Sequence, residues 1–486
     1  MKSQNILLYY NNIYIIFRER CMDITNKKFH FIAIGGVGMS ALAKYLAERG
    51  ASVTGSDISE SKYTHLLEKK GVKVTIGHDE NLIQNDMIVV ASTAIKENNV
   101  EIVKAKQLGI KIYHRSDILK MISDEFSDNN DSLFIGFSGT HGKTTTSGLC
   151  SYVSEKAGLN PSYVVGGIIP DINTNGKYSG NKYFIAELDE SDGTIAKYST
   201  DIAVINNMEE DHLDFYKNGF EDIAKTFNKY LSNKPGQKVI INIDNEGCRK
   251  FMELYSNYNF ITFGLNNADY SAVEIKREGL GSSFKICKKG QIISEIKLSV
   301  PGVHNIYNAL AVIAAFIEAG EDIEKIKEHF YTFSGMGRRF QKVSEFDGIQ
   351  IYDDYAHHPS EIKTTLKSVK EAVEDKKRVV AVFQPHRYTR LQSLWKEFKT
   401  AFDFADVLFI TDVYPAGESA IEGVSSEKFS KEIIHKNTFY IKGDVTEAAE
   451  KIYPMLKKND IVITLGAGSV TKAGTIITDL AKGILK

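Results

Sequence analysis

The segment that most constrains the fold of this chain is GTHGKTTT, residues 139–146. It follows an apolar run at residues 133–138 and precedes a stretch with helical character that begins near residue 147. A strand, a glycine-rich turn and a helix N-terminus together present backbone N–H groups at the positive end of a helix dipole, an arrangement that binds phosphate. The order therefore predicts a P-loop-type α/β sheet with an anion site at one edge.

The turn departs from the common nucleotide pattern at one point. That pattern is G-x-x-x-x-G-K-[ST], and the upstream glycine, Gly136, lies one position too far from Gly142. The tail Gly142-Lys143-Thr144 matches fully. We expect Lys143 to reach the β and γ phosphates of a nucleotide and the Thr144 hydroxyl to bind Mg²⁺. The alternative is an ordinary turn between a strand and a helix. It would explain the glycines, but not the adjacent lysine and threonine, which have no role in packing a hydrophobic core.

Composition limits the classes of partner. The 486 residues suggest three domains, and 43% apolar residues with eight prolines indicate well-filled cores. Sixty basic and 62 acidic side chains give a net charge of -2, so no chain-wide positive field attracts nucleic acid or an anionic membrane. The expected partners are small molecules. Four widely spaced cysteines without a C-x-x-C pair suit a reducing, cytoplasmic location.

The N-terminal residues contain one membrane-like stretch, ILLYYNNIYIIF. It is short, is broken by Asn11 and Asn12, and is followed by charged residues without a small-residue cleavage site. We therefore expect neither membrane insertion nor a secretion signal. Because a second methionine, Met22, precedes the first clear strand, residues 1–21 are interpreted as a non-essential extension.

The first segment, residues 22–130, is predicted to be a Rossmann-like domain. Residues 36–41, GVGMSA, fit G-x-G-x-x-[GA] after a strand, and Asp57 follows where an acid that binds ribose is expected. This fingerprint recognises a diphosphate and a ribose, so a dinucleotide and a nucleotide-sugar both satisfy it. Ser92, His114 and Arg115 are expected at strand ends that face the ligand.

The middle segment, residues 131–333, carries acids directly after two apolar runs. Carboxylates at strand ends of such a sheet are candidates for magnesium and phosphate chemistry, although most acids of this kind are solvated loop residues. Two magnesium ions would neutralise the charge that develops during phosphoryl transfer. At a later helix start, His304, Asn305 and Asn308 would serve a purine base or cap the helix. The candidate acids and histidine are Glu187, Asp189, Glu190, Asp192, Glu209, Asp211 and His212.

The last segment, residues 334–486, predicts a second Rossmann-like α/β sheet. Four apolar runs alternate with charged stretches, and each run ends in polar residues. Arg387 and Arg390 suit two-pronged binding of a carboxylate, such as that of an amino acid. No Ser-His-Asp or Cys-His pairing stands out, which argues against an acyl-enzyme route.

The motifs IGGVGMS, GTHGKTTT, ELDESD, NNMEEDHLD, GVHNIYNA, GMGRRF, DDYAHHP, FQPHRYTR, DVYPAGE and GAGSV occur in this order. Together they resemble the ATP-dependent Mur ligases from about residue 29 to the C-terminus. The resemblance implies three domains: 22–130 for a UDP-sugar, 131–333 for ATP, and 334–486 for an amino acid and ATP. It also implies a cytoplasmic enzyme that uses ATP and Mg²⁺.

The implied reaction joins L-alanine to the carboxylate of UDP-N-acetylmuramate through an acyl phosphate, in peptidoglycan precursor synthesis. Only small-molecule substrates are expected, without nucleic acid or membrane insertion; a homo-oligomer is possible. By resemblance, Lys143, Glu187, His212 and Arg338 would be catalytic, and Thr144, Glu187 and His212 would bind the metal.

Binding roles follow from the same resemblance. The UDP-sugar would contact Gly35, Gly36, Gly38, Asp57, Ser92, His114 and Arg115. ATP would contact Gly139, Thr140, His141, Gly142, Lys143, Thr144, Thr145, His304, Asn305, Arg339, Asp353 and Asp354. The amino acid would contact Tyr355, His358, Arg387 and Arg390.

One departure and three alternatives stay open. The family motif GRHN reads GVHN here, so Val303 replaces an arginine. Lys225 lies near the position of a carbamylated lysine in sister ligases and is given no role. A dehydrogenase leaves the GKT turn unexplained, and a nucleotide switch needs no nucleotide-sugar site. A peptide-recycling ligase, which attaches a tripeptide to the same UDP-sugar, shares most of these motifs.

Overall fold

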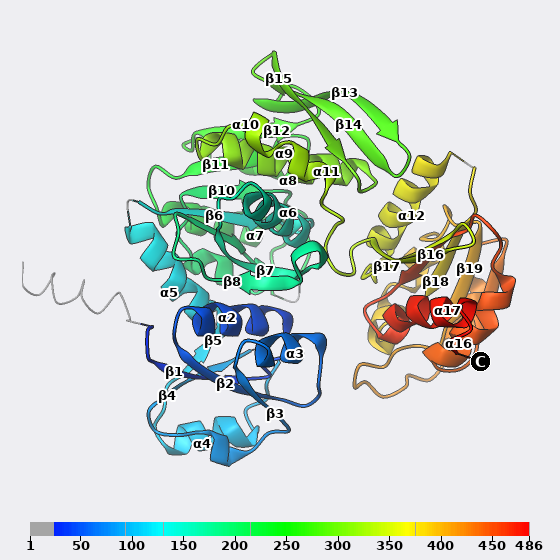
Figure 1. The fold of residues 1–486 in the computed structure, drawn as a ribbon, viewed down its shortest axis with the longest axis horizontal. Coiled ribbons are helices and arrows are strands. Elements are labelled where there is room, and N and C mark those ends of the chain that lie inside the picture. Colours follow the sequence, from blue (N-terminus) through cyan, green and yellow to red (C-terminus); the bar gives the residue numbers. More distant parts are fainter. Residues whose placement is uncertain (1–23, 93, 130, 214, 375, 486) are drawn as a thin grey trace, which may run out of the picture. The chain divides into compact units, whose positions relative to one another are not determined.

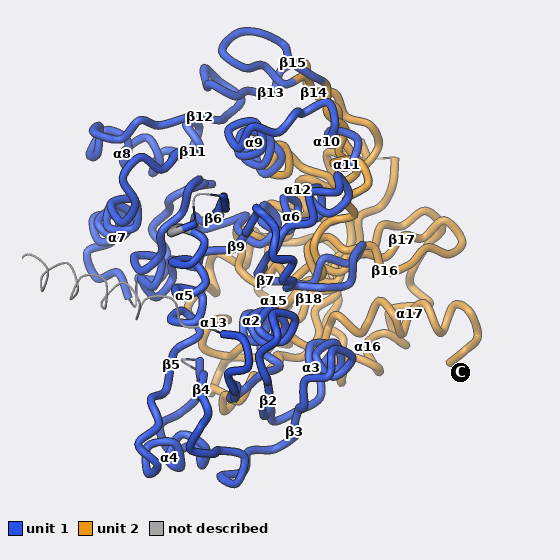
Figure 2. Tube along the Cα trace, turned by 60° about the vertical axis from the view of Figure 1, so that its left-hand side comes forward, with its two compact units in different colours: residues 1–273, 286–294, 307–329 blue, residues 274–285, 295–306, 330–486 orange. Residues whose placement is uncertain are grey.

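The computed structural model describes residues 24–485 except 93, 130, 214 and 375, so the predicted extension, residues 1–21, lies outside the described residues. Three α/β sheets follow one another along the chain (Figure 1), which confirms the predicted fold class. The chain forms two compact units (Figure 2). Unit 1 contains the described residues up to 273 with 286–294 and 307–329, and unit 2 contains 274–285, 295–306 and 330–486.

The first sheet has the parallel order β3-β2-β1-β4-β5. The order changes direction between β1 and β4, which is where ligands bind in open parallel sheets. The predicted glycine turn after β1 leads into α2 at this point. The strands are β1 (Lys28–Ile32), β2 (Ser52–Asp57), β3 (Lys73–Ile76), β4 (Met87–Ala91) and β5 (Ile112–His114), and the helices are α2 (Val37–Glu48), α3 (Lys62–Glu68), α4 (Val100–Gln107) and α5 (Arg115–Asp128).

The middle sheet has the order β15-β14-β13-β12-β11-β10-β6-β9-β7-β8. Its central strand β6 is the predicted run at 133–138, and it pairs parallel with β9 and β10. The strands are β6 (Leu133–Ser138), β7 (Ser162–Ile169), β8 (Thr174–Lys177), β9 (Tyr183–Glu187), β10 (Ile202–Ile205), β11 (Lys238–Asn242), β12 (Phe260–Gly264), β13 (Tyr270–Glu278), β14 (Gly281–Lys288) and β15 (Gln291–Leu298). The helices are α6 (Lys143–Lys156), α7 (Phe220–Ser232), α8 (Glu246–Leu254), α9 (Val303–Glu318), α10 (Ile323–Ile326) and α11 (Glu328–Tyr331).

The third sheet has the order β16-β17-β21-β18-β19-β20, with only β16 antiparallel among its described pairings. Alternate residues of β18 fill separate cores on its two faces, because successive side chains of a strand point to opposite sides. The strands are β16 (Gln341–Phe346), β17 (Ile349–Asp354), β18 (Val379–Phe383), β19 (Val407–Thr411), β20 (Thr438–Ile441) and β21 (Ile461–Leu465). The helices are α12 (Pro359–Val373), α13 (Tyr388–Ser393), α14 (Trp395–Phe398), α15 (Ser426–Glu432), α16 (Val445–Ile452) and α17 (Ala473–Ala481).

Within unit 1, α2 packs directly on β7 and β8. Asn175 in β8 donates its Nδ2 to the Val37 carbonyl at 2.9 Å and to Ser40 Oγ at 3.0 Å. A Cβ atom at Gly176 would lie 2.5 Å from the Ala41 carbonyl oxygen, so only glycine permits this approach of the two backbones. The helix that begins at the first glycine turn is therefore fixed against the middle sheet.

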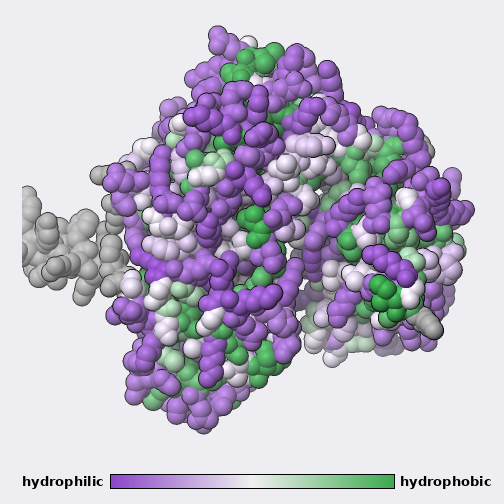
Figure 3. All heavy atoms as spheres, in the orientation of Figure 1, coloured by the Kyte–Doolittle hydropathy of each residue, from purple (hydrophilic) through white to green (hydrophobic). Residues whose placement is uncertain are grey.

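Hydrophilic residues predominate on the molecular face shown in Figure 3. Across the described residues, every helix is too short or too polar to cross a bilayer.

A buried carboxylate joins strands β1 and β2 to helix α4. Glu101 has no exposed surface, and its Oε2 lies 3.0 Å from His30 Nε2 and 2.9 Å from Ser56 Oγ. Its Oε1 lies 3.0 Å from His78 Nδ1 and accepts the Asp79 N–H at 3.2 Å. Burial raises the pKa of Glu101, but the hydrogen bonds from His30, Ser56 and His78 outweigh it, so the net pKa is lowered.

Replacing this carboxylate should destabilise the protein in a pH-dependent way. Glu101→Gln keeps the size but removes the charge and turns an NH₂ group toward hydrogen-bond donors, which should lower the free energy of unfolding by about 2 kcal/mol. Because the folded pKa is lowered, the carboxylate stabilises the native state above the unfolded pKa of about 4.3, and this contribution disappears as pH falls through the folded value. Denaturant unfolding followed by circular dichroism from about pH 7 to about pH 3 would measure this. The exposed Glu97→Gln is the control, and identical stability curves for Glu101→Gln and wild type would contradict the prediction.

Candidate functional site

The GTHGKTTT segment forms the turn between β6 and α6. Gly139 (φ +121°) and Gly142 (φ +83°) both have positive φ. Gly142 is the N-cap residue of α6, and because glycine has no side chain it cannot accept a hydrogen bond from the first N–H groups of the helix. Asn207, after β10, holds the turn: its Oδ1 accepts the His141 N–H at 2.7 Å and its Nδ2 donates to the His141 carbonyl at 3.0 Å. The first N–H groups of α6 therefore lack a capping side chain, as in helix termini that bind anions.

Both glycines are required by close contacts as well as by φ. A Cβ at Gly139 would lie 2.7 Å from the Asn207 carbonyl oxygen, and one at Gly142 would lie 2.8 Å from Asn308 Oδ1. Side chains at these positions would push the turn away from the sheet. The predicted turn is therefore shaped by close contacts with the Asn207 backbone and with the Asn308 side chain.

Lys143, the first residue of α6, lies over this turn. Its Nζ donates to the Gly139 carbonyl at 2.7 Å, the Thr140 carbonyl at 3.2 Å and Glu190 Oε1 at 2.9 Å. Burial lowers the pKa of Lys143, but the carboxylate of Glu190 and two further acids raise it by more, so the net pKa is raised. The side chain is a fixed cation beside the N-terminus of α6.

Thr144 and Glu187 lie together at the end of β9. Thr144 donates its hydroxyl to Glu187 Oε1 at 3.1 Å, and Glu187 Oε2 accepts the Gly166 N–H at 2.9 Å. Burial raises the pKa of Glu187, and the charge of Lys143 opposes this shift. The predicted metal ligands Thr144 and Glu187 are thus in direct contact, with two hard oxygen donors on one side of the turn.

The first glycine turn is organised by Asp57. Gly36 is the N-cap of α2 and has no side-chain cap among the described residues. The Asp57 Oδ2 atom accepts the Gly35 N–H at 2.8 Å, so this carboxylate holds the turn at the end of β1. The structure therefore brings Gly35, Gly36 and Asp57 together, and the predicted contact of Asp57 with a ribose stays a prediction.

Arg115 connects this turn to the acids of the middle sheet. A Cβ at Gly38 would lie 3.2 Å from Arg115 Nη1, so the guanidinium lies directly against the glycine. Its Nη2 donates to Asp189 Oδ2 at 3.0 Å, and both side chains are about one-third exposed. Burial raises the pKa of Asp189, but the charge of Lys143 and that of Arg115 contribute to a net lowering. The Arg115 guanidinium thus lies between the first glycine turn, at Gly38, and Asp189 near the second glycine turn.

His114 presents an unused ring nitrogen beside Arg115. It is the N-cap of α5, and its Nδ1 accepts the Ser116 N–H at 3.3 Å. Burial lowers the pKa of His114. Because Nδ1 accepts the Ser116 N–H, the neutral ring would carry its proton on Nε2. That buried Nε2 has no partner among the described residues. Ser92 lies just after β4, half-buried, at the same edge of the first sheet.

In unit 2, Arg338 joins the ends of β17 and β21. It has a positive φ of +59°, and its Nε donates to Asp353 Oδ2 at 3.1 Å. Its Nη2 donates to the Gly466 carbonyl at 2.6 Å, and its Nη1 to the Ala467 carbonyl at 3.4 Å. Asp353, which is 2% exposed, also accepts the Thr471 hydroxyl at 2.8 Å. The side chains of Arg338 and Asp353, both predicted site residues, are therefore hydrogen-bonded within unit 2.

Asp354 and Arg339 lie next to Arg338 and Asp353, and these four residues are called the unit 2 cluster below. Asp354 accepts the Phe340 N–H at 2.9 Å and the Ala356 N–H at 2.8 Å. Burial raises the pKa of Asp354 to about 6, while the charge of Arg339 opposes the shift. The Arg339 guanidinium lies 5.6 Å from the centre of the Tyr355 ring, and 38% of its side chain is exposed. Of the two arginines, Arg339 has the more exposed side chain, 38% against 20% for Arg338.

A second group in unit 2 combines histidines, a tyrosine and arginines. His386 stacks on Tyr414 with ring centres 5.6 Å apart, and its Nδ1 accepts from Arg390 Nη1 at 3.0 Å. Burial, with the charge of Arg390, lowers the pKa of His386 to about 4, so the ring is neutral. His357 lies 6.3 Å from His386 between ring centres. Arg387 is exposed at the start of α13 with a φ of +68°.

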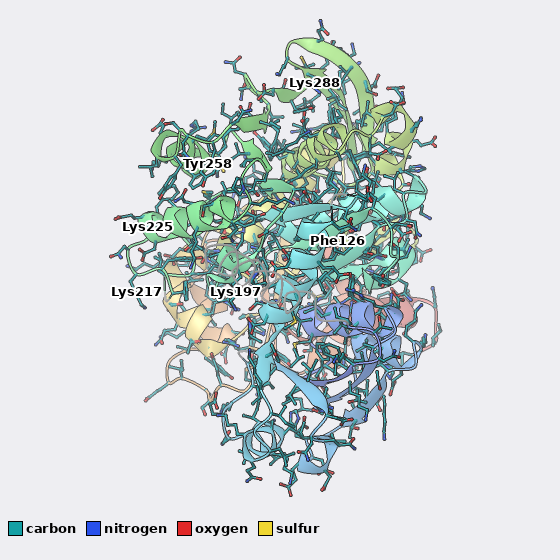
Figure 4. The ribbon with its side chains drawn as sticks, turned by 90° about the vertical axis from the view of Figure 1, so that its left-hand side faces the viewer. Phe126, Lys197, Lys217, Lys225, Tyr258 and Lys288 are labelled. Atoms are coloured by element: carbon teal, nitrogen blue, oxygen red, sulfur yellow. The ribbon has the colours of Figure 1, made fainter. Side chains whose placement is uncertain are left out.

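Several predicted residues lie apart from these contacts. His358 caps α12, with its Nδ1 2.8 Å from Ser360 Oγ, and is exposed. Asn305, near the start of α9, donates to the Pro301 carbonyl at 2.7 Å and lies 3.2 Å from His304 Nε2. Lys225 points outward from α7 (Figure 4) and pairs with Glu221 at 2.7 Å.

His212 occupies the loop after β10. It has a φ of +55°, and its Nε2 lies 3.8 Å from Asp211 Oδ2. Its side chain is 38% exposed. In the described part of the chain, no three or more His, Cys, Asp or Glu side chains form a group that would hold a metal ion.

The structure adds residues that had no predicted role. Asn206 donates its Nδ2 to Thr146 Oγ1 at 2.8 Å, and Asn207 holds the turn at residues 139–146, which is called the phosphate turn below after its predicted ligand. Their position directly after the apolar run of β10 is a signal that could have identified them. His386 and Tyr414 follow β18 and β19 in the same way, but their stacking depends on the order of the sheet.

Family models match three consecutive parts of the chain. The Mur ligase family catalytic domain matches residues 28–127, the Mur ligase middle domain matches 137–316, and the Mur ligase glutamate ligase domain matches 338–468. These segments contain the first turn, the phosphate turn and the unit 2 cluster, respectively.

Relatives match almost the entire chain. A UDP-N-acetylmuramate–L-alanine ligase from Dictyoglomus turgidum is 42% identical and covers 94% of this chain and 97% of its own. One from Geotalea daltonii is 39% identical, over 92% and 96%. The crystal structure of UDP-N-acetylmuramate-alanine ligase from Thermotoga maritima has a TM-score of 0.80 at 27% identity and covers 94% of this chain and all of that one.

Gly142 and Gly236 provide a matched pair that separates backbone strain from collision. Both have a φ of +83°, but a Cβ at Gly236 would meet nothing within 4 Å, whereas one at Gly142 would meet Asn308. An alanine at positive φ costs about 1 kcal/mol at either position, and the collision should add about 1 to 3 kcal/mol at Gly142 alone. Denaturant unfolding of Gly142→Ala and Gly236→Ala measures the difference. Equal destabilisation would show that the contact with Asn308 does not shape the turn.

Proposed function

The chain belongs to the Mur ligase family, and on this basis we propose that it joins L-alanine to the carboxylate of UDP-N-acetylmuramate while ATP is converted to ADP and phosphate. The observation that carries the proposal is the presence in unit 1 of two glycine turns at helix N-termini, with Arg115 between the first turn and the acids beside the second. One turn suits a nucleotide-sugar diphosphate and the other suits the ATP phosphates.

The chemistry explains why one enzyme needs both turns. A carboxylate is a poor electrophile, because displacement by an amine would expel oxide. Transfer of the γ-phosphoryl group of ATP to a carboxylate oxygen gives an acyl phosphate, which the deprotonated amine attacks, and phosphate leaves. Holding the reactants in position lowers the barrier by about 7 to 11 kcal/mol. Positioning and charge neutralisation are therefore the main contributions of the protein.

Residues of unit 1 divide between the two nucleotides. We propose that the N–H groups beside Gly36 and Gly38 bind the UDP diphosphate, while the unused His114 Nε2–H donates to an oxygen of the sugar-nucleotide. The N–H groups of the phosphate turn and Lys143 bind the ATP phosphates. Arg115 supplies positive charge beside the first turn, where a diphosphate would need it.

The residues around the phosphate turn fit magnesium. Thr144 and Glu187 offer a hydroxyl and a carboxylate oxygen 3.1 Å apart, the hard donors that Mg²⁺ prefers. A bound Mg²⁺ would neutralise charge on the transferred phosphoryl group. We propose Thr144 and Glu187 as ligands of the ion, with His212 as a further ligand.

We propose that unit 2 supplies the amino-acid site and part of the ATP site. Arg387 and Arg390 provide the positive charge that an amino-acid carboxylate needs, and Tyr355 and His358 belong to the same set. Because the guanidinium of Arg338 already bonds to Asp353, Gly466 and Ala467, we assign the contact with the γ-phosphate to Arg339. Arg338 then acts by holding the ends of β17 and β21 together. We assign the binding of the ATP ribose and purine to Asp353, Asp354, His304 and Asn305.

The proposed compartment is the cytoplasm. Three cysteines of the described chain, Cys150, Cys248 and Cys287, are free thiols, and thiols persist in a reducing compartment.

An amino-acid incorporation assay tests the reaction. Radiolabelled L-alanine should enter a UDP-linked product only when both ATP and UDP-N-acetylmuramate are present. Glycine lacks one methyl group, so its kcat/KM should be lower by about tenfold or more. Incorporation of the tripeptide in preference to alanine would replace this proposal with the recycling ligase. Binding of NAD at the first turn would favour a dehydrogenase instead.

Lys143→Ala should abolish turnover while UDP-N-acetylmuramate still binds. The ammonium group lies at the second turn, so its loss removes a contact with ATP and leaves the first turn intact. Single-turnover kinetics and calorimetric titration of the UDP-sugar measure the two effects. Lys156→Ala, an exposed lysine at the other end of α6, is the control and should behave as wild type. Loss of UDP-sugar affinity in Lys143→Ala would refute the division of roles between the turns.

A further inference from the structure

All three protons of the Lys143 ammonium group are used within the protein. Two go to the Gly139 and Thr140 carbonyls, which hold Nζ over the phosphate turn, and the third goes to Glu190 Oε1 at 2.9 Å. A phosphate that meets this lysine needs a proton directed toward it. The two carbonyl contacts belong to the turn itself, so the contact with Glu190 is the one that a phosphate would replace.

Glu190 is built firmly into its position. The residue is 3% exposed, and its carbonyl oxygen accepts the Gly193 N–H at 2.9 Å and the hydroxyl of Tyr216. Its second carboxylate oxygen, Oε2, is buried and has no hydrogen-bond partner in the described chain. The carboxyl group is therefore held beside Lys143 by its backbone, with Lys143 as the partner of one oxygen.

We propose that the Glu190 carboxylate takes the place of a nucleotide phosphate on Lys143 and acts as an internal competitor of ATP. This inference rests on the proposed function, in which Lys143 binds the ATP phosphates. It assigns Glu190 as a positioning residue that acts through Lys143. Nucleotide binding then requires the Glu190–Lys143 contact to open, and the contact re-forms when the nucleotide leaves.

The physical consequence is a lower apparent affinity for nucleotide. When only a fraction of the protein is competent to bind, the apparent Kd equals the intrinsic Kd divided by that fraction. Breaking the resting contact raises the competent fraction, so nucleotide should bind more tightly and associate faster. The dissociation rate should stay unchanged, because the contact is absent from the bound state.

Two neighbouring acids allow contact and charge to be separated. Glu190→Asp keeps the negative charge but withdraws the carboxylate from Lys143 by one methylene, whereas Glu190→Gln removes the charge at the same position. Asp189→Asn removes a charge that also acts on Lys143, but Asp189 bonds to Arg115 and Ser191 instead. Asp189→Asn is therefore the control for simple electrostatics.

The experiment measures stopped-flow binding of fluorescent mant-ADP, without added metal, to the full-length wild type and these variants. We expect Glu190→Asp and Glu190→Gln to bind about tenfold more tightly, through a higher association rate, and Asp189→Asn to change affinity by about threefold or less. Unfolding curves of the same preparations establish that each variant is folded.

Three results would overturn the inference: weaker or unchanged binding by folded Glu190→Asp, equal tightening by Asp189→Asn, or a gain that appears in the dissociation rate. Lys143→Ala distinguishes failure of the underlying function. If mant-ADP binds wild type and Lys143→Ala with the same affinity, the nucleotide assignment fails. If binding depends on Lys143 but not on Glu190, only the competition is wrong.

Discussion

The charge of the buried Lys143 ammonium group is the interaction on which the rest of unit 1 depends. Burial raises the pKa values of Glu187 and Glu190, and the positive charge of Lys143 opposes both shifts. The same acids keep the lysine protonated although burial favours its neutral form. Buried carboxylates that lie close together are costly unless a cation pairs with them, and Lys143 supplies that charge here.

This arrangement extends to the first sheet through Arg115. The guanidinium lies against Gly38 at one turn and bonds to Asp189, the residue before Glu190, near the other. Helix α2 is in turn fixed to β8 by Asn175. The two turns therefore belong to one packed unit, so the fold itself sets the distance between them and, in the proposed function, the distance between the two nucleotides. A reaction in which one ligand phosphorylates the other requires such a distance.

Backbone-determined features were predictable from the sequence, and features that depend on sheet order were not. The apolar run at 133–138 with its glycine turn is β6 and the start of α6, and four predicted apolar runs near the C-terminus are strands of the third sheet. The hairpin strands β13–β15 were missed, although apolar and polar residues alternate along them and the connections contain Gly279 and Gly290, which together are a strand and hairpin signal. In the motif DDYAHHP, the resemblance assigns a role to His358, which stays a prediction, and the structure adds that His357 lies near His386. Only the pairing of β17, β21 and β18 brings those strand ends together.

The glycines of the phosphate turn have a consequence for inhibitor design. A compound that recognises only the main-chain N–H groups of this turn would touch atoms that every amino acid except proline shares. Resistance at a target site arises by exchange of a side chain that the compound contacts, but here any new side chain at Gly139 would collide with the Asn207 backbone. Resistance would therefore have to arise elsewhere, for instance in drug uptake or in the amount of enzyme produced.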